Sequence, residues 1–269
     1  MLRNYFFNNF KKIKHSLYVK KIYYNYFIKE KIKVIYTHKN NTFLVFLKKR
    51  KIYRKFSFTK NGIKKIHSAY IGLRWYCLSQ NLEISKIVYN YKKTKTISFL
   101  DTKTIDGKQI KSWNNLSNNY KYIIKVLDHY KKIFKKDKIH KIHGDLTLDN
   151  IFFRKKSVFI IDWEFFSSKK NKWGYDAVYL VLSSIVLPYI ANNSFTTKDK
   201  ICFIKLWKIL IKMKIDKNLM LEPFLYFKKN IKTDKFLRES LSISKEKFFP
   251  FLVTAKLHKE IINLTRQLK

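Results

Sequence analysis

The segment HGDLTLDNIFFRKKSVFIIDWE, residues 143–164, decides how the whole chain is interpreted. Its two short runs of β-forming residues, 151–153 and 158–161, are joined by a polar turn, which predicts a hairpin. Asp145 and Asn150 lie in the loop before this hairpin, five residues apart, so the loop can aim both side chains into one cleft. Asp162 follows the second strand, and the hairpin returns the chain so that we expect Asp162 beside Asn150.

Three such side chains meet the needs of phosphoryl transfer. A carboxylate must orient the attacking hydroxyl, and hard oxygen ligands must hold the Mg²⁺ ions that bridge the phosphates. The apolar strand before Asp162 predicts a buried, firmly held metal ligand. Taken singly, each of these residues would be an ordinary turn or cap residue, but their coincidence at this spacing favours a functional site.

This stretch resembles the family that includes aminoglycoside phosphotransferases, choline kinases and fructosamine kinases, which shares its fold with protein kinases. The family pattern is H-G-D-x-x-x-x-N followed by I-D-[FW]-E, and it is matched here by His143, Gly144, Asp145, Asn150, Ile161, Asp162, Trp163 and Glu164. The resemblance implies that Asp145 orients or deprotonates the acceptor hydroxyl and that Asn150 and Asp162 bind Mg²⁺. It also implies that His143 supports catalysis by bonding the backbone near Asp162. Asp176 matches a further family aspartate that opens the next helix, where it can act as an N-cap.

The order of predicted elements indicates an α+β protein with the protein-kinase-like, two-lobed fold. A small antiparallel N-lobe with one main helix is predicted from strands at 31–37, 42–47 and 52–58, a helix at 63–80, and strands at 84–89 and 96–100. A connector at 101–107 leads to a larger, mainly helical C-lobe, with helices expected at 113–134, 175–190, 198–214, 219–227 and 248–267. We therefore predict a basic aromatic extension at 1–30, a nucleotide-binding N-lobe at 31–106, and a C-lobe with the catalytic loop and substrate site at 107–269.

The resemblance also places ATP-binding residues in the N-lobe. The third strand is where the family keeps its phosphate-binding lysine, and we choose Lys55 because an apolar residue follows it. Arg54 is the alternative, since a shift of one residue moves it to the same face. The connector looks like the family's hinge, whose backbone groups meet the adenine, which implies contacts from Thr102, Thr104 and Ile105.

Two family features are missing from the N-lobe. The helix at 63–80 contains no Glu to pair with the strand lysine, and Ala69 or Tyr70 falls near the expected place. No G-x-G-x-x-G loop is present either. These departures keep a catalytically weak pseudokinase scaffold open as an alternative. Asp145, Asn150 and Asp162 together favour an active enzyme, because chemistry needs those residues and folding does not.

The formal charge of +41 bears on the partners. Only seven of the 59 basic residues are Arg, and Lys, Ile, Asn, Phe and Tyr share AT-rich codons, so a biased genome explains much of the excess. Nucleic-acid readers favour Arg, so nucleic acid is an unlikely partner, although a basic nucleic-acid-binding protein remains an alternative. The 18 acidic residues fit a cationic antibiotic poorly. A hydroxyl of a small molecule or glycan is the better acceptor: a sugar, a choline-like compound, or a precursor of cell-surface polysaccharide or lipopolysaccharide.

Further patterns bear on location. Two distant cysteines, Cys77 and Cys202, offer no disulfide framework, which favours a reducing compartment and a cytoplasmic protein. The apolar run 177–191 is interrupted and shorter than the ~20 residues of a membrane span, so we expect a core helix. The first 30 residues mix Lys with Tyr and Phe, which is compatible with a helix on an anionic membrane surface or one packed on the small lobe. Trp163, Trp173 and Tyr175 are either core residues or an aromatic acceptor pocket.

Overall fold

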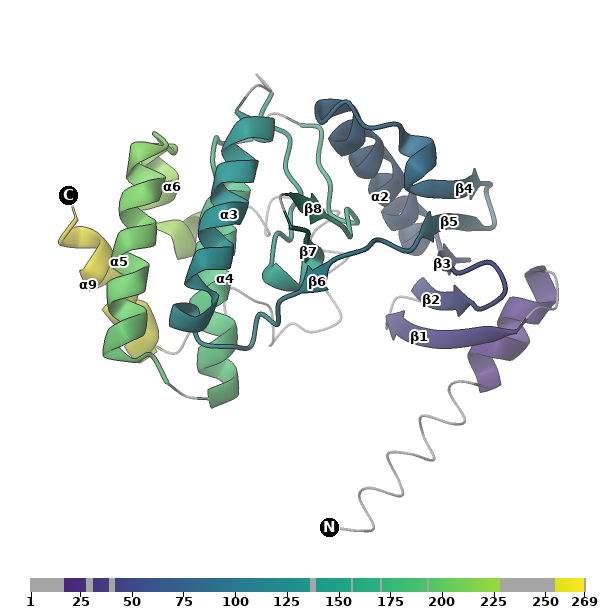
Figure 1. Cartoon of the computed structure of the whole chain (residues 1–269), viewed down its shortest axis with the longest axis horizontal. Coiled ribbons are helices and arrows are strands. Elements are labelled where there is room, and N and C mark those ends of the chain that lie inside the picture. Colours follow the sequence, from purple (N-terminus) through teal and green to yellow (C-terminus); the bar gives the residue numbers. More distant parts are fainter. Residues whose placement is uncertain are drawn as a thin grey trace, which may run out of the picture. The chain divides into compact units, whose positions relative to one another are not determined.

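The computed structural model describes residues 17–27, 31–38, 42–135, 139–155, 157–169, 171–192, 194–227 and 255–268. The chain divides into two compact units, Met1–Tyr70 with Glu83–Thr104 (unit 1) and Ile71–Leu82 with Ile105–Lys269 (unit 2). Antiparallel strands dominate the first unit and helices the second (Figure 1), which confirms the predicted α+β class. Helix α2, Lys60–Ser79, contributes its first half to unit 1 and its second half to unit 2.

Unit 1 is built on a five-stranded antiparallel sheet of order β1-β2-β3-β5-β4. Its strands are Ile32–His38 (β1), Thr42–Leu47 (β2), Ile52–Ser57 (β3), Val88–Lys93 (β4) and Ser98–Lys103 (β5). The first three agree with the predicted runs. The prediction for the last two was shifted: a short 3-10 turn, η1 (Ile84–Lys86), occupies the start of the expected strand at 84–89. Strand β5 extends to Lys103, and so includes three residues that were predicted to belong to the connector. One of them, Asp101, pairs with Arg54 of β3.

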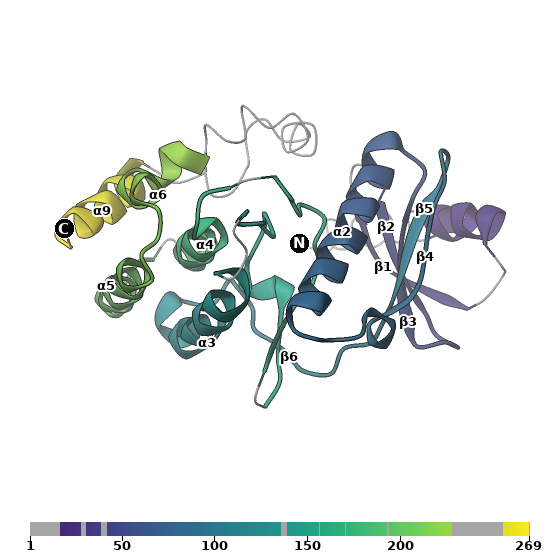
Figure 2. The same ribbon diagram turned by 90° about the horizontal axis from the view of Figure 1, so that it is seen from above.

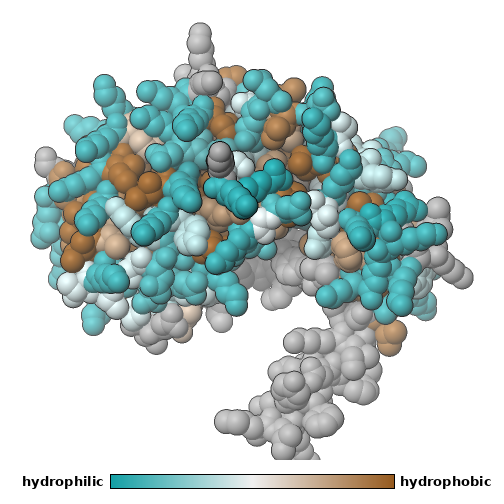
Figure 3. Space-filling model, viewed as in Figure 1, coloured by the Kyte–Doolittle hydropathy of each residue, from teal (hydrophilic) through white to brown (hydrophobic). Residues whose placement is uncertain are grey.

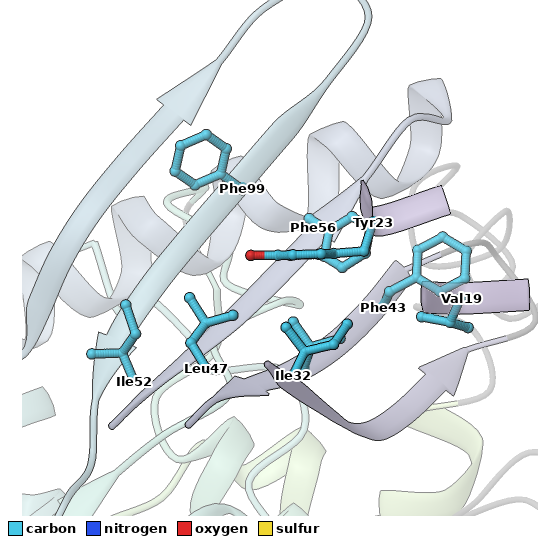
Figure 4. Packing of buried hydrophobic residues seen from close by; sticks show 9 residues of the cluster. Val19, Tyr23, Ile32, Phe43, Leu47, Ile52, Phe56 and Phe99 are labelled. Carbon is cyan, nitrogen blue, oxygen red and sulfur yellow. The ribbon is translucent and has the colours of Figure 1, made fainter. Parts of the chain in front are cut away.

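A helix covers each face of this sheet (Figure 2), with α2 on one side and the helix at residues 17–26 on the other. The second helix buries Val19 and Tyr23 against the strands in a core shared with Phe43, Leu47 and Phe56 (Figure 4). The rings of Tyr23 and Phe56 meet edge to face at 5.7 Å. Of the two placements expected for the basic aromatic segment, the structure therefore shows packing on the small unit for residues 17–26.

Unit 2 combines a small sheet with a group of helices. The sheet has the order β6-β7-β8, and its strands are Lys108–Gln109, Ile151–Phe153 and Val158–Ile160. The helices are Leu116–Phe134 (α3), Tyr175–Asn192 (α4), Thr197–Lys212 (α5), Lys217–Leu221 (α6) and Ala255–Arg266 (α9). Helices α3, α4 and α5 pack against one another in pairs. The helix predicted at 219–227 breaks after Leu221, and residues 248–254 of the last predicted helix lie outside the described residues.

Helix α4 is the apolar centre of unit 2. Residues 177–186 are all buried, and the hydroxyls of Ser183 and Ser184 donate to the Leu180 carbonyl, so its polar side chains are satisfied inside the core. Among the described helices, none is long and apolar enough to cross a membrane. The face in Figure 3 is mostly hydrophilic, with apolar residues scattered over it. Trp163 and Tyr175 are at most 4% exposed, which makes both core residues and excludes them as walls of an open acceptor pocket.

Candidate active site

The loop that carries the motif is held at both ends by backbone bonds. Ile142 and Ser167 exchange two N–H···O bonds of 3.1 Å, forming an isolated bridge that closes the segment. Inside it, the carboxylate of Asp176 accepts hydrogen bonds from the backbone N–H of His143 at 2.8 Å and of Gly144 at 2.9 Å. Asp176 was expected as an N-cap, but it acts as a clamp on this loop. Burial raises the pKa of Asp176 to about 7, although the two amide hydrogen bonds oppose this rise.

Gly144 is required by the geometry of the same turn. Its φ of +88° lies in the left-handed region, and an added Cβ would meet the carbonyl oxygen of Phe165 at 2.5 Å. Only a residue without a side chain allows this close approach of two backbone segments. The motif glycine thus brings the loop against the segment that follows Asp162.

His143 connects the loop to the hairpin. Its Nδ1 lies 3.3 Å from the backbone nitrogen of Asp145, and its Nε2 lies 2.8 Å from the carbonyl oxygen of Ile161. The backbone N–H can only donate and the carbonyl can only accept, so these contacts assign a neutral ring with its proton on Nε2. The side chain is fully buried. The bond to the backbone next to Asp162, which the family resemblance implied, is therefore present.

The structure brings Asp145 and Asn150 together. The amide nitrogen of Asn150 donates to the backbone oxygen of Asp145 at 2.8 Å and lies 3.4 Å from the carboxylate Oδ2. The backbone of Asn150 in turn accepts a bond from Ile161 N–H at 2.9 Å, and Ile151 pairs with Ile160 across the hairpin. The hairpin therefore returns the chain to Asn150 as the sequence predicted.

Asp162 lies directly after this connection, but its environment differs from the prediction. We expected a buried ligand, and the structure shows an exposed residue. Its φ of +62° is uncommon for a residue with a side chain, and it turns the chain away from the strand direction after Ile161. Strand burial stops at Ile160, so the preceding strand does not enclose the carboxylate. An exposed carboxylate on a strained backbone is the arrangement expected of a group that meets a ligand.

Asp145 is partly buried, and its carboxylate has two partners. The hydroxyl of Tyr179, from α4, donates to Oδ1 at 3.0 Å, and the Asn150 amide lies near Oδ2. Desolvation raises the pKa of Asp145 to about 7, and repulsion from Asp162 and Glu164 adds to the rise, while the two hydrogen bonds oppose it. Among the described residues, no Lys or Arg forms an ion pair with this carboxylate.

The donor set fits a nucleotide-bound Mg²⁺ ion and does not fit a closed protein cage. No group of three or more His, Cys, Asp or Glu side chains that could hold a metal occurs in the part of the chain that the structure describes. Mg²⁺ at phosphate sites usually takes one or two carboxylates and completes its shell with phosphate oxygens and water. The Asn150 amide nitrogen is used within the loop, and its amide oxygen receives no hydrogen bond from the described residues. That oxygen and the Asp162 carboxylate are therefore the two candidate ligands.

In unit 1, the structure separates the two candidate cations of β3. Arg54 is buried on the face covered by the helix at 17–26, where its guanidinium bonds both carboxylate oxygens of Asp101, at 2.7 and 2.6 Å. The Tyr23 hydroxyl lies 3.3 Å from Nη1 of Arg54. Because side chains alternate along a strand, Lys55 belongs to the opposite face, the one nearer α2. Arg54 is thus committed to the sheet interior, and Lys55 remains the candidate for phosphate binding.

The candidate hinge residues lie at the end of β5 and just after it. Thr102 belongs to the strand and pairs with Tyr53 of β3, while Thr104 and Ile105 follow the strand end at Lys103. Thr104 is exposed, and Thr102 and Ile105 are partly buried. Helix α2 extends from Lys60 to Ser79 and still contains no acidic residue, so the family's helix Glu is absent from the helix that the structure shows.

Three residues have roles that their sequence pattern did not indicate. Asp101 was assigned to the connector, because a charged residue in a strand centre has no signal for its partner 47 positions away. Tyr179 was not singled out within the apolar run 177–191, although its hydroxyl reaches Asp145. Asp149 was not singled out; its carboxylate bonds Ser112 N–H at 3.2 Å and the Ser112 hydroxyl, which ties the loop to the segment before α3.

Comparison with known proteins finds similarity only to solved structures, at low sequence identity. No family model and no curated protein matches the sequence. Among solved structures, the GDP complex of aminoglycoside 2'-phosphotransferase-IIIa is 10% identical, with a TM-score of 0.41 over 94% of this chain and 97% of that chain. The Cydia pomonella Granulovirus kinase, PK-1, is 15% identical, with a TM-score of 0.36 over 96% of this chain and 91% of that one. These values describe a distant resemblance of fold and say nothing about what this chain binds.

Proposed function

We propose that this protein is an ATP-dependent phosphotransferase that acts on a hydroxyl group. The observation that carries the proposal is the arrangement of one short segment of unit 2. A partly buried carboxylate without a described cation, Asp145, contacts Asn150, and Asn150 is bonded to the residue before the exposed, strained Asp162. Two features of this arrangement cost stability, because a desolvated carboxylate and a left-handed backbone are both unfavourable in folding. Phosphoryl transfer needs all three groups.

The roles follow from the environment of each residue. Asp145 orients the acceptor hydroxyl and accepts its proton, a task suited to a carboxylate whose pKa lies near 7. Asp162 and the amide oxygen of Asn150 would hold Mg²⁺, which supplies charge stabilisation for the phosphates when bound. His143 keeps the loop and the hairpin in register. Lys55 would bind phosphate, and the backbone of Thr102, Thr104 and Ile105 would meet the adenine.

The acceptor class is part of the proposal. With 59 basic and 18 acidic residues, the protein favours neutral or anionic acceptors over polycations. A sugar or glycan hydroxyl fits this balance best, including a precursor of cell-surface polysaccharide or lipopolysaccharide, and a choline-like compound fits it less well. The proposal includes a reducing, cytoplasmic setting, which the free cysteines Cys77 and Cys202 support.

The direct test is Mg²⁺-dependent phosphate release from ATP, with water alone and with a panel of sugars, amino alcohols and glycan precursors. We expect turnover by the wild type, and a loss of about 10²–10⁴-fold in Asp145→Asn, as for removal of a general base. Asp128→Asn is the matched control, because Asp128 is an exposed carboxylate on α3. A wild type that binds no nucleotide and releases no phosphate contradicts the proposal and favours the pseudokinase scaffold.

A second candidate role is contact with an anionic membrane surface, which would place this activity at the inner face of a membrane. The helix at 17–26 leaves Leu17, Tyr18 and Tyr26 between 57% and 59% exposed, and the exposed Lys21 lies among them. Apolar and cationic groups on one helix are the usual signature of binding at a lipid headgroup layer. Deleting this helix would also remove Tyr23 from the core, so substitutions are the sharper test. Changing the three exposed residues to Ser should abolish binding to anionic vesicles; unchanged binding, or retention on nucleic acid alone, contradicts this role.

A further inference from the structure

The Tyr179 hydroxyl is the hydrogen-bond donor closest to the Asp145 carboxylate among the described residues. It donates to Oδ1 at 3.0 Å, whereas the Asn150 amide lies 3.4 Å from Oδ2. Tyr179 is 4% exposed, so the bond is sheltered from competing water. One oxygen of the carboxylate is therefore held firmly, and the other is left with a single long contact.

Tyr179 is itself fixed by its position on α4. It lies three residues after Asp176, so the two side chains project from nearly the same face of the helix. Asp176 holds the backbone of the loop through His143 and Gly144, while Tyr179 holds the side chain of Asp145. The Tyr179 ring meets the Phe227 ring edge to face at 5.6 Å, which limits its freedom to swing away. One turn of α4 thus fixes both the main chain and the side chain at this point.

The chemical character of the partner also matters. A lysine or arginine in place of Tyr179 would neutralise the carboxylate and compete with the acceptor for it. A phenol hydroxyl restrains one oxygen without adding a charge, so it lowers the pKa of the carboxylate less than a cation would. A phenylalanine at this position would fill the same space and leave the carboxylate free to rotate.

We propose that Tyr179 is a positioning residue for phosphoryl transfer: its hydroxyl holds Oδ1 of Asp145 so that Oδ2 faces the acceptor hydroxyl. This proposal rests on the phosphotransferase function proposed above. In the step, the acceptor oxygen forms a bond to the γ-phosphorus of ATP as the bond from that phosphorus to the ADP oxygen breaks. The hydroxyl proton passes to Oδ2 of Asp145 and is later released to solvent. Tyr179 keeps its own proton throughout.

The test compares Tyr179→Phe with the wild type in Mg²⁺-dependent phosphate release, using water as the acceptor and ATP as the varied substrate. We expect kcat to fall about ten- to a hundredfold, as for loss of a hydrogen bond to a charged group. KM for ATP should change less than about twofold, because the Tyr179 hydroxyl donates to the carboxylate of Asp145. Tyr189→Phe, which removes a hydroxyl from the same helix at a partly buried position, should match the wild type.

A double-mutant cycle separates positioning from general damage. If Tyr179 acts through Asp145, then Tyr179→Phe should cost no further activity in an Asp145→Asn background. An unchanged kcat in the single variant overturns the proposal and leaves the phosphotransferase function intact. Additive losses, or a KM for ATP that rises as kcat falls, also overturn it. A wild type that releases no phosphate removes the proposed function and this proposal together.

Discussion

Asp101 in unit 1 and Asp145 in unit 2 are both withdrawn from water, but the protein treats them in opposite ways. Asp101 is fully buried, and its carboxylate accepts two hydrogen bonds from the guanidinium of Arg54. The guanidinium is further enclosed by the rings of Phe27 and Phe99, at 4.5 and 4.6 Å. Asp145 is partly buried, and its described partners are a phenol and an amide, neither of which carries a charge.

The two carboxylates differ in what balances their charge. A charge removed from water needs a partner, and Asp101 finds it within the fold. The charge of Asp145 is not balanced by a cation among the described residues, and desolvation of this charge raises the pKa of Asp145 to about 7. We therefore infer that Asp145 meets a ligand, because carboxylates with a perturbed pKa cluster at functional sites.

Breaking the structural pair should have the largest effect on stability. Asp101→Asn leaves the Arg54 guanidinium buried without its carboxylate, and we expect a loss of about 3–5 kcal/mol in the free energy of unfolding. The double variant Arg54→Met, Asp101→Leu should recover most of that loss, since it removes both charges. Urea denaturation measures both changes.

The exposed pair Glu83–Lys86 is the matched control for this experiment. Its side chains are 71% and 68% exposed, so Glu83→Gln should cost less than about 0.5 kcal/mol. If Asp101→Asn costs no more than Glu83→Gln, then the buried pair of Arg54 and Asp101 does not stabilise the fold.

The functional carboxylate should also depend on the turn that carries it. Gly144→Ala places a Cβ against the Phe165 carbonyl at a φ of +88°, and we expect a loss of about 1–3 kcal/mol in unfolding free energy. Phosphate release should fall with it, because the loop must shift to relieve the contact. Asp106→Ala is the control variant in unit 2, because Asp106 is exposed and its replacement should change neither stability nor phosphate release. A Gly144→Ala protein as stable and as active as the wild type would show that the close approach is not needed.

Neutralising Asp145 should instead stabilise the protein. Its pKa is raised from 3.8 to about 7, so the folded state binds the proton more tightly than the unfolded state. The stability that the protonated form contributes at low pH is lost as the pH rises from about 4 to about 7, and it stays lost above. Asp145→Asn removes this loss, and we expect a gain of about 1–2 kcal/mol at pH 8 and little change at pH 4.

Thermal unfolding in EDTA at the two pH values measures the Asp145 effect. Asp176 titrates in the same range and is present in both proteins, so the difference between them isolates Asp145. An Asp145→Asn protein that is less stable than the wild type at pH 8 would mean that the carboxylate is structural after all.

The local structure around Asp145 could be predicted from sequence, but its contrast with Asp101 depends on contacts that the sequence does not encode locally. The loop, the hairpin and the pairing of Asn150 with its neighbours followed from spacing and strand alternation. The exposure of Asp162 did not, because the left-handed turn after Ile161 leaves no mark in residue type. Asp101 was misplaced and Tyr179 overlooked for a similar reason: each is defined by a partner more than 30 residues away.

The most direct test of the central claim, that unit 2 reserves its carboxylates for a ligand, is the thermal shift produced by ATP with Mg²⁺ and with EDTA. We predict a rise in the unfolding temperature of the wild type with Mg²⁺ and ATP, a much smaller rise in EDTA, and almost no Mg²⁺-dependent part in Asp162→Ala. Asp128→Ala should behave like the wild type. Equal shifts with and without Mg²⁺, or a full Mg²⁺-dependent shift in Asp162→Ala, would contradict the account.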